Sequence, residues 1–127
     1  MEKGRTNRPS GSASFTLLPN KVKDLIEAVL RGPGESQEEL RQILLGRAVD
    51  LSLGGDTIEP PENLKVYSDK VARWAHKVLD EEVVELREAG YSDDQIFELT
   101  ICSALGAGTA RFEAGLAALE EMQEHED

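Results

Sequence analysis

Apolar residues recur every three or four positions along most of the chain, which is the spacing of one face of an α-helix. The clearest case is the stripe formed by Val22, Leu25, Ile26, Val29 and Leu30. Pro19 precedes this stripe, and Gly32 follows it as a residue that can take a left-handed cap. The pattern predicts a helix over 20–31. No segment of the chain makes a convincing strand.

A second helix is predicted over 36–51. Ser36 and Glu39 have the spacing of a capping box, in which each side chain satisfies a free amide of the first turn. The apolar positions that follow are Leu40, Ile43, Leu44, Ala48 and Leu51, together with the aliphatic stem of Arg47. Gly54 and Gly55 end this helix. The adjacent prolines of 57–63 then predict a stiff linker in which helix cannot continue.

The next stretch predicts a third helix over about 61–78 and a short fourth helix over 81–89. The apolar face of the third helix is formed by Leu64, Tyr67, Val71, Trp74, Ala75 and Val78. Asp80 is the expected N-cap of the fourth helix, and Gly90 is its expected end. Without a break at residues 79–80, one bent helix would explain the same pattern.

The fifth predicted helix is the longest and runs from Ser92 to about Met122. Ser92 and Gln95 form a second capping box. Two glycines in the middle of such a helix each cost about 1 kcal/mol relative to alanine, so close approach of another backbone is expected. Gly106, Ala110 and Ala114 form one smooth ridge. The ridge predicts tight helix packing, within the chain or across a dimer; the alternative is a gap for a small ligand.

Composition supports an all-α fold of five to six helices in one domain. Hydrophobic residues make up 39% of the 127 positions but aromatic residues only 5%, so the core must consist mainly of Leu, Ala and Val. Residues 1–15 carry glycine, proline and serine and predict a flexible arm. Residues 16–122 form the predicted helical domain, and residues 123–127 form an acidic tail.

Charge and cysteine content narrow the possible partners. The chain has 25 acidic and 14 basic residues, a net charge of −11, which argues against binding to nucleic acid or anionic membranes. No apolar run approaches the roughly 18 residues of a membrane span, and no secretory signal is expected. The lone Cys102 can form neither an internal disulfide nor a cysteine-based zinc site. We expect a cytoplasmic protein without metal or cofactor.

One segment resembles a known family. The segment from Tyr67 to Leu119 resembles the alkyl hydroperoxidase D (AhpD) and carboxymuconolactone decarboxylase superfamily. The most specific part of the resemblance is the run REAGYSDDQIFELTICSALGAGTARFEAGLAAL, at 87–119. Shared features are the glycine turn, the S-D-x-x-I helix start and a long alanine-rich helix with an arginine in its middle. The resemblance implies an AhpD-like helical fold and assembly into a homo-oligomer, such as a dimer, trimer or hexamer.

The thiol enzymes of that superfamily carry C-x-x-C-x-x-x-H on the helix before the glycine turn. Counted back from Gly90, the resemblance places the two cysteines at Ala75 and Val78 and the histidine at Glu82. The family's upstream glutamate falls near Asn63, beside Glu62. None of the three motif positions keeps its residue, so the two-cysteine mechanism is not expected here.

Several other residues are candidates for chemistry or binding. His76, Glu81, Glu82 and Cys102 are the catalytic candidates, and Arg73, Trp74, Glu98 and Arg111 are the binding candidates. A histidine with a pKa near 6.5 suits proton transfer, and a cysteine acts as a nucleophile only as a thiolate. The structural alternatives are a surface histidine, a buried cysteine, salt-bridged arginines and a tryptophan in the core or a subunit interface.

Two functions follow from these observations. The first is a non-thiol, AhpD-like helical oligomer that binds a small molecule or serves as an auxiliary assembly protein. The second is an enzyme of the alkylhydroperoxidase or carboxymuconolactone decarboxylase type, acting on a small acid or hydroperoxide through His76 and nearby carboxylates. The enzyme requires His76, a carboxylate and an arginine to converge on one cavity.

Overall fold

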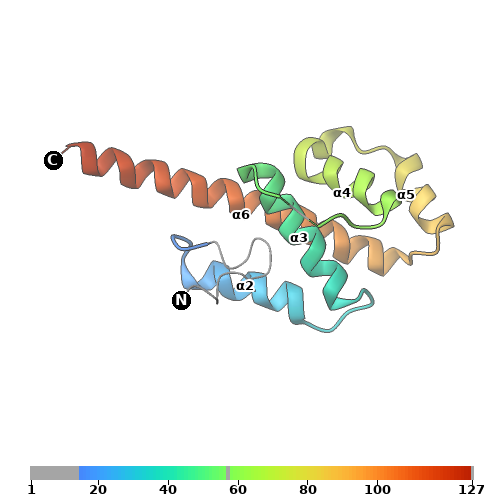
Figure 1. Cartoon of the computed structure of the whole chain (residues 1–127). Helices are drawn as coiled ribbons and strands as arrows, with labels where there is room; N and C mark the ends of the chain where they lie inside the picture. Colours follow the sequence, from blue (N-terminus) through green and yellow to red (C-terminus); the bar gives the residue numbers. More distant parts are fainter. Residues whose placement is uncertain (1–14, 57, 127) are drawn as a thin grey trace.

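The computed structural model describes residues 15–56 and 58–126. Over these residues the chain forms α-helices and a single 3-10 turn, without a strand (Figure 1). The elements are α2 (Asn20–Arg31), α3 (Glu38–Leu53), α4 (Glu62–Trp74), the 3-10 turn η2 (Ala75–Lys77), α5 (Asp80–Glu88) and α6 (Asp93–Glu126). This architecture confirms the predicted all-α fold with one long C-terminal helix.

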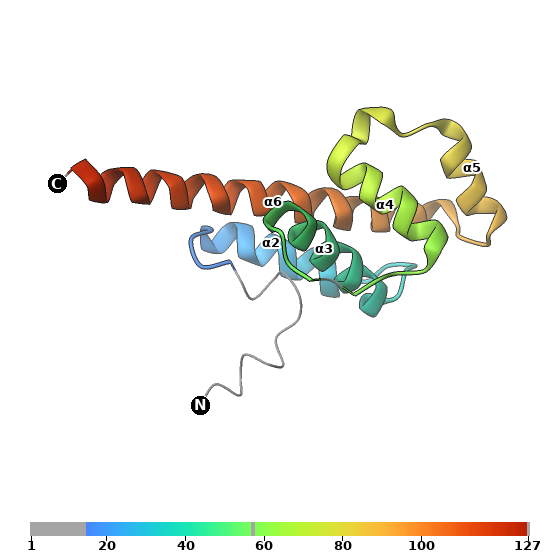
Figure 2. The ribbon, with the colours of Figure 1, turned by 45° about the horizontal axis from the view of Figure 1, so that its top comes forward.

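The long helix α6 is the element to which the others attach. α3 crosses it, α2 runs beside its middle part, and α4 and α5 lie near its N-terminal end (Figures 1 and 2). The C-terminal part of α6 extends beyond the other helices. Within the described residues, no helix combines the length and the apolar character that crossing a membrane would require.

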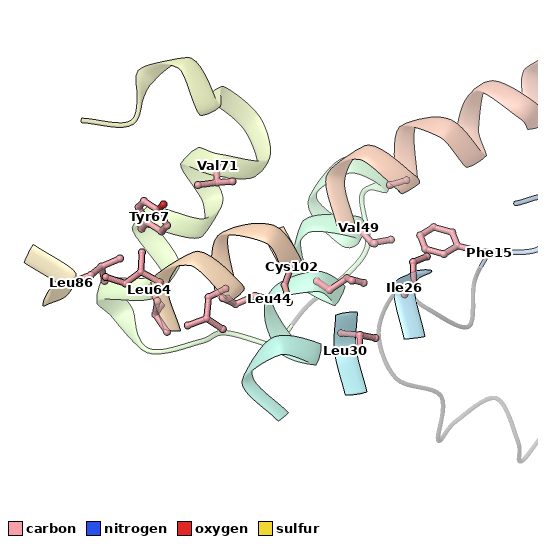
Figure 3. Packing of buried hydrophobic residues seen from close by; sticks show 14 of the residues in the cluster. Phe15, Ile26, Leu30, Leu44, Val49, Leu64, Tyr67, Val71, Leu86 and Cys102 are labelled. Atoms are coloured by element: carbon pink, nitrogen blue, oxygen red, sulfur yellow. The ribbon is translucent and has the colours of Figure 1, made fainter. Parts of the chain in front are cut away.

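The main core lies where α2, α3, α4 and α6 meet (Figure 3). Its fully enclosed side chains are mostly aliphatic, as expected from the low aromatic content, and include Leu44, Leu45, Val49, Leu64, Leu86 and Leu99. Phe15 is only 4% exposed and belongs to this core. The predicted arm therefore extends one residue too far, while residues 1–14 lie outside the described part of the chain.

Gly106 brings α6 into direct contact with the backbone of α3. A Cβ atom at this position would lie 2.4 Å from the carbonyl oxygen of Leu45 and 3.0 Å from the Cβ of Ala48. The close backbone approach expected of this glycine therefore occurs within the chain. Gly108 has open space around it and faces away from α3.

Several helix ends agree with the sequence. α2 has the predicted bounds. Ser92 and Gln95 form their capping box, with the amide of Ser92 donating to Gln95 Oε1 at 2.8 Å and the amide of Gln95 donating to Ser92 Oγ at 3.1 Å. Gly54 and Gly90 have positive φ angles of 86° and 108°. Glycine adopts such angles readily, and for this reason each was expected to end its helix.

Other helix ends differ from the prediction. Ser36 does not cap α3, which begins at Glu38 with Gln37 as the capping residue. The third helix ends at Trp74, and η2 and an extended residue separate it from α5, so the break before Asp80 is real. Leu79, rather than Asp80, precedes the first turn of α5. α6 continues through Glu126, so most of the predicted acidic tail is helical.

Candidate functional site

A groove of about 510 Å³ lies between α4 and α5. We call it the α4–α5 groove, and its lining consists of Glu62, Asn63, Val66, Tyr67, Glu82, Glu85 and Leu86. Its volume is within the range of small-molecule sites. The space exists because the chain turns through η2 after α4, so that α5 returns beside α4 and packs mainly through the buried Leu86.

The apolar part of the groove is held in place by the core beneath it. Leu86 is 2% exposed and Tyr67 is 7% exposed. Tyr67 Oη lies 2.8 Å from Thr100 Oγ1, which itself donates to the carbonyl of Ile96 at 2.6 Å. Because a hydroxyl has one proton, Tyr67 must be the donor to Thr100. The phenol is therefore satisfied by α6, and the side chain borders the groove in a fixed position.

The polar part of the groove is acidic. Glu82 accepts hydrogen bonds from Lys70 Nζ at 2.6 Å and from the amide of Leu79 at 2.7 Å. These two donors, Lys70 first, hold the pKa of Glu82 below its usual value. Glu62 and Glu85 are exposed. The lining thus carries three carboxylates and no basic residue, which favours a cation over an anion.

Cys102 lies far from this acidic surface. It is fully buried in the core between α3 and α6 (Figure 3). Burial away from water raises the pKa of its thiol to about 11, so the nucleophilic thiolate is scarce at neutral pH. The buried-cysteine alternative matches this environment.

Glu98 fixes the connection between α2 and α3. Its carboxylate accepts bonds from the amides of Glu35 and Ser36, at 2.9 and 2.8 Å, and from Ser36 Oγ at 2.6 Å. Burial alone would raise the pKa of Glu98, but the Ser36 hydroxyl and these amides outweigh it and lower the pKa. Glu98 therefore acts as a structural anchor, and the Ser36 hydroxyl predicted to cap α3 is used here instead.

Arg41 completes the same connection and was not predicted from the sequence. Arg41 is 6% exposed. It donates to the carbonyl oxygens of Val29, Leu30 and Gly32 at the end of α2, at 3.1, 3.2 and 2.7 Å. It also donates to Ser36, at Oγ and at the carbonyl. One buried cation thus satisfies the carbonyls that a helix end leaves open.

Two further arginines hold α4 in place. Arg47 forms a paired contact with Asp69, with Nε–Oδ1 and Nη2–Oδ2 distances of 2.6 and 2.9 Å. The hydrogen bonds to Asp69 raise the pKa of Arg47, and burial, which alone would lower this pKa, does not cancel their effect. Arg111 donates from Nη2 to the carbonyl of Ala72 at 2.8 Å. Arg111 therefore joins α6 to the end of α4.

The residues around η2 lie on the surface. Trp74 is 48% exposed, so of its two predicted places the core is wrong, and the subunit interface stays a prediction. Arg73 and Lys77 lie 5.8 and 5.9 Å from the centre of its ring, within cation–π range. His76 is exposed, as its structural alternative predicted.

The structure does not bring the catalytic candidates together. Of these, only Glu82 lines the α4–α5 groove. His76 and Glu81 are exposed outside its lining, and Cys102 is in the core. The four binding candidates Arg73, Trp74, Glu98 and Arg111 also lie outside the groove. The convergence of a histidine, a carboxylate and an arginine that the enzyme requires is therefore not found in this groove.

The sequence named Glu62, Asn63, Tyr67 and Glu82 but did not identify the groove that they line, and it missed Val66, Glu85 and Leu86. Tyr67 carried an apolar-face signal, which is correct but does not distinguish a core position from a groove wall. Val66 and Glu85 carried no signal, because each is an ordinary surface residue of its own helix. Among the described residues, no group of three or more His, Cys, Asp or Glu side chains is arranged to hold a metal ion.

Comparisons of the chain with protein-family models, with curated proteins and with solved structures find no match.

Proposed function

We propose that this chain is a non-thiol, AhpD-like helical protein that binds a small molecule in the α4–α5 groove, and that the ligand carries a positive charge beside an apolar group. The observation that carries the proposal is the lining: three carboxylates face a 510 Å³ space whose other walls are Asn63 and the apolar side chains of Val66, Tyr67 and Leu86. A cation would gain from the carboxylates, and an apolar group would be removed from water.

The register implied by the resemblance supports this location. It assigns the family's histidine position to Glu82 and the family's upstream glutamate to Asn63, beside Glu62, and all three of these residues line the groove. In our proposal the chain keeps the family's helical frame and uses the corresponding positions for binding without a thiol.

The charge of the lining also argues against the alternative function. A small carboxylate entering the groove would meet Glu62, Glu82 and Glu85 without a basic partner among the lining residues. Lys70, which is not a lining residue, is already bonded to Glu82. We therefore favour binding of a cation over decarboxylase-like turnover. A neutral hydroperoxide is not repelled by this charge, but the groove has no thiol to reduce it, and Cys102 is buried in the core.

The test compares two ligands of similar shape and opposite charge. We expect 2-phenylethylammonium to bind and to shift the amide resonances of 62–67 and 82–86, whereas 3-phenylpropanoate should bind at least about tenfold more weakly. Glu85→Gln should weaken binding of the cation about threefold to tenfold. Glu88→Gln, on the same helix but outside the groove, is the matched control.

The proposal fails if the anion binds as tightly as the cation. It also fails if Glu85→Gln and Glu88→Gln have the same effect on affinity, or if the shifted resonances lie elsewhere. Glu82 is unsuitable for the first variant, because its carboxylate also accepts the amide of Leu79 at the start of α5.

A further inference from the structure

The side of α6 that faces away from α3 is apolar along most of its length. We define the outer face of α6 as Phe97, Ile101, Ala104, Leu105, Gly108, Phe112, Gly115, Leu119 and Met122. At about 100° per residue, these positions fall within a sector of roughly 100°, and between 97 and 122 the sector holds no charged or polar residue. A helix face turned to water is normally polar.

These residues are accessible in the single chain. Phe97, Phe112, Leu119 and Met122 are 65%, 44%, 57% and 60% exposed. Ala104, Gly108 and Gly115 are exposed as well, and only Ile101 and Leu105 are partly covered. The opposite side of α6 is the one that packs in the chain, through Gly106 and Ala110.

We propose that the outer face of α6 pairs with the same face of a second copy of this chain, with the two helices antiparallel and crossing at Gly108. This proposal is independent of the ligand in the α4–α5 groove. The ridge that begins at Gly106 was one candidate for contact across a dimer, but α3 already packs against Gly106. The outer face of α6 is a different surface for the expected homo-oligomer.

The sizes of the side chains support the antiparallel register. With Gly108 opposite Gly108, Phe112 lies opposite Ala104, Ile101 lies opposite Gly115, and Phe97 lies opposite Leu119. Large side chains therefore meet small ones near the crossing point. In the same register Leu105 lies level with Arg111, and Met122 lies level with Asp94. A parallel pair would instead place Phe112 against Phe112 and Gly115 against Gly115, which alternates crowding with gaps and packs poorly.

The available area is sufficient for an interface. A large side chain presents about 200 Å² when fully exposed, so the four large residues leave on the order of 450 Å² accessible, and the smaller residues raise this to on the order of 600 Å². Two copies would bury about 1,200 Å², the lower end of the range for stable interfaces. The face itself carries no charged side chain, and Arg111, which is exposed beside it, is bonded to the carbonyl of Ala72 at the border of the contact.

Other occupants fit less well. The first 14 residues contain only Met1 and Ala13 as apolar side chains, so the chain's own N-terminal segment cannot cover this face. An anionic lipid surface would be repelled by the net charge of −11. A second copy supplies a surface of the same length and matching sizes.

Sedimentation equilibrium of the full chain, from about 1 μM to about 1 mM, tests the proposal. We expect a species of twice the 13.9 kDa chain mass, with association that tightens as salt screens the repulsion between two acidic chains. Leu119→Glu should raise the dissociation constant at least about tenfold. Ala117→Glu, which adds the same charge on roughly the opposite side of the exposed helix, should raise it less than about threefold.

Cross-linking tests the register separately. In a Cys102→Ala background, Gly108→Cys should be joined to its partner by a short bismaleimide, because the two copies of residue 108 lie opposite one another. Gly115→Cys should not be joined, because its two copies would lie about 21 Å apart along the helix axis. Circular dichroism of every variant establishes that it is folded.

Three outcomes would overturn the proposal. The first is a chain that stays monomeric over the whole concentration range. The second is a dimer that Leu119→Glu and Ala117→Glu weaken equally, which would place the contact elsewhere. The third is equal cross-linking of Gly108→Cys and Gly115→Cys, which would indicate a parallel pair.

Discussion

The region where α2, α3 and α6 meet and the region formed by α4 and α5 use their charged residues in opposite ways. In the first region, Arg41 and Glu98 form hydrogen bonds with backbone groups at and beside the α2–α3 connection. In the second region, Glu62 and Glu85 face an open groove. The charges of Arg41 and Glu98 have their partners in the chain, whereas the exposed carboxylates of Glu62 and Glu85 are placed where a ligand can meet them.

The same difference between the two regions explains why two of the candidate functional residues, Cys102 and Glu98, do not lie in the α4–α5 groove. Cys102 and Glu98 are close to the packed region, where burial and hydrogen bonds fix their protonation states. A reactive group must exchange protons or reach a substrate, and Cys102 is fully buried. Glu98 lines a pocket of about 160 Å³ with Arg41, but its carboxylate is already bonded to the amides of Glu35 and Ser36. The α4–α5 region is less tightly packed, with Leu86 as the one buried residue of α5.

The largest expected effect in the packed region comes from Gly106→Ala. The new Cβ would meet the backbone oxygen of Leu45, which cannot move without shifting α3, so the free energy of unfolding should fall by about 2 to 3 kcal/mol. Gly108→Ala has open space and should raise it by up to about 1 kcal/mol. Urea denaturation in dilute solution measures both, and equal stabilities would contradict the close approach of α3.

A smaller effect is expected for Glu98→Gln, at about 1 to 2 kcal/mol near neutral pH, because three donors lose their anionic acceptor. The folded pKa of Glu98 is below the ordinary 4.5, so its contribution is fully present above 4.5 and is lost as pH falls through the folded pKa. The stability gap between wild type and variant should therefore shrink below about pH 4.5.

Glu120→Gln, an exposed change on the same helix, provides the control for Glu98→Gln. A gap between wild type and Glu98→Gln that stays constant down to pH 3 would mean that ionisation of Glu98 does not stabilise the fold. The groove variant Glu85→Gln sharpens the contrast between the two regions, because it should change ligand affinity with little change in stability.

The smallest effect is expected for Cys102→Ala, which should leave hydroperoxide consumption unchanged. With its thiol buried and its pKa raised to about 11, hydroperoxide consumption with an added dithiol should stay at background for the wild type and for Cys102→Ala. Turnover that is present in the wild type and lost in the variant would make Cys102 a nucleophile and would reverse the assignment of this region to structure.

Those features of the fold that depend only on residues close together in the sequence could be predicted. The bounds of α2, the Ser92–Gln95 capping box and the glycine helix ends follow from spacing within a few residues. The capping box predicted at Ser36 was wrong because its hydroxyl is used by Glu98, 62 positions away. A local motif cannot reveal a competing partner that only the folded chain brings near.

The candidate site was less predictable for the same reason. Glu82 was identified from the spacing implied by the family resemblance, whereas Glu85 and Val66 become wall residues only when α5 folds back beside α4. Trp74 was expected in the core or in a subunit interface, because a large aromatic side chain can anchor either. Its position at the end of α4, beside the surface turn η2, leaves nothing of the described chain to cover it fully.

The bonds from Glu98 to the α2–α3 connection also bear on the order in which the chain folds. α2 and α3 are neighbours in sequence, yet the amides of Glu35 and Ser36 are satisfied by a carboxylate of α6. In a partly folded chain in which α6 has not docked, those two amides can bond only to water. Exchange of their protons with solvent therefore reports the docking of the last helix, although they lie in the first connection between helices.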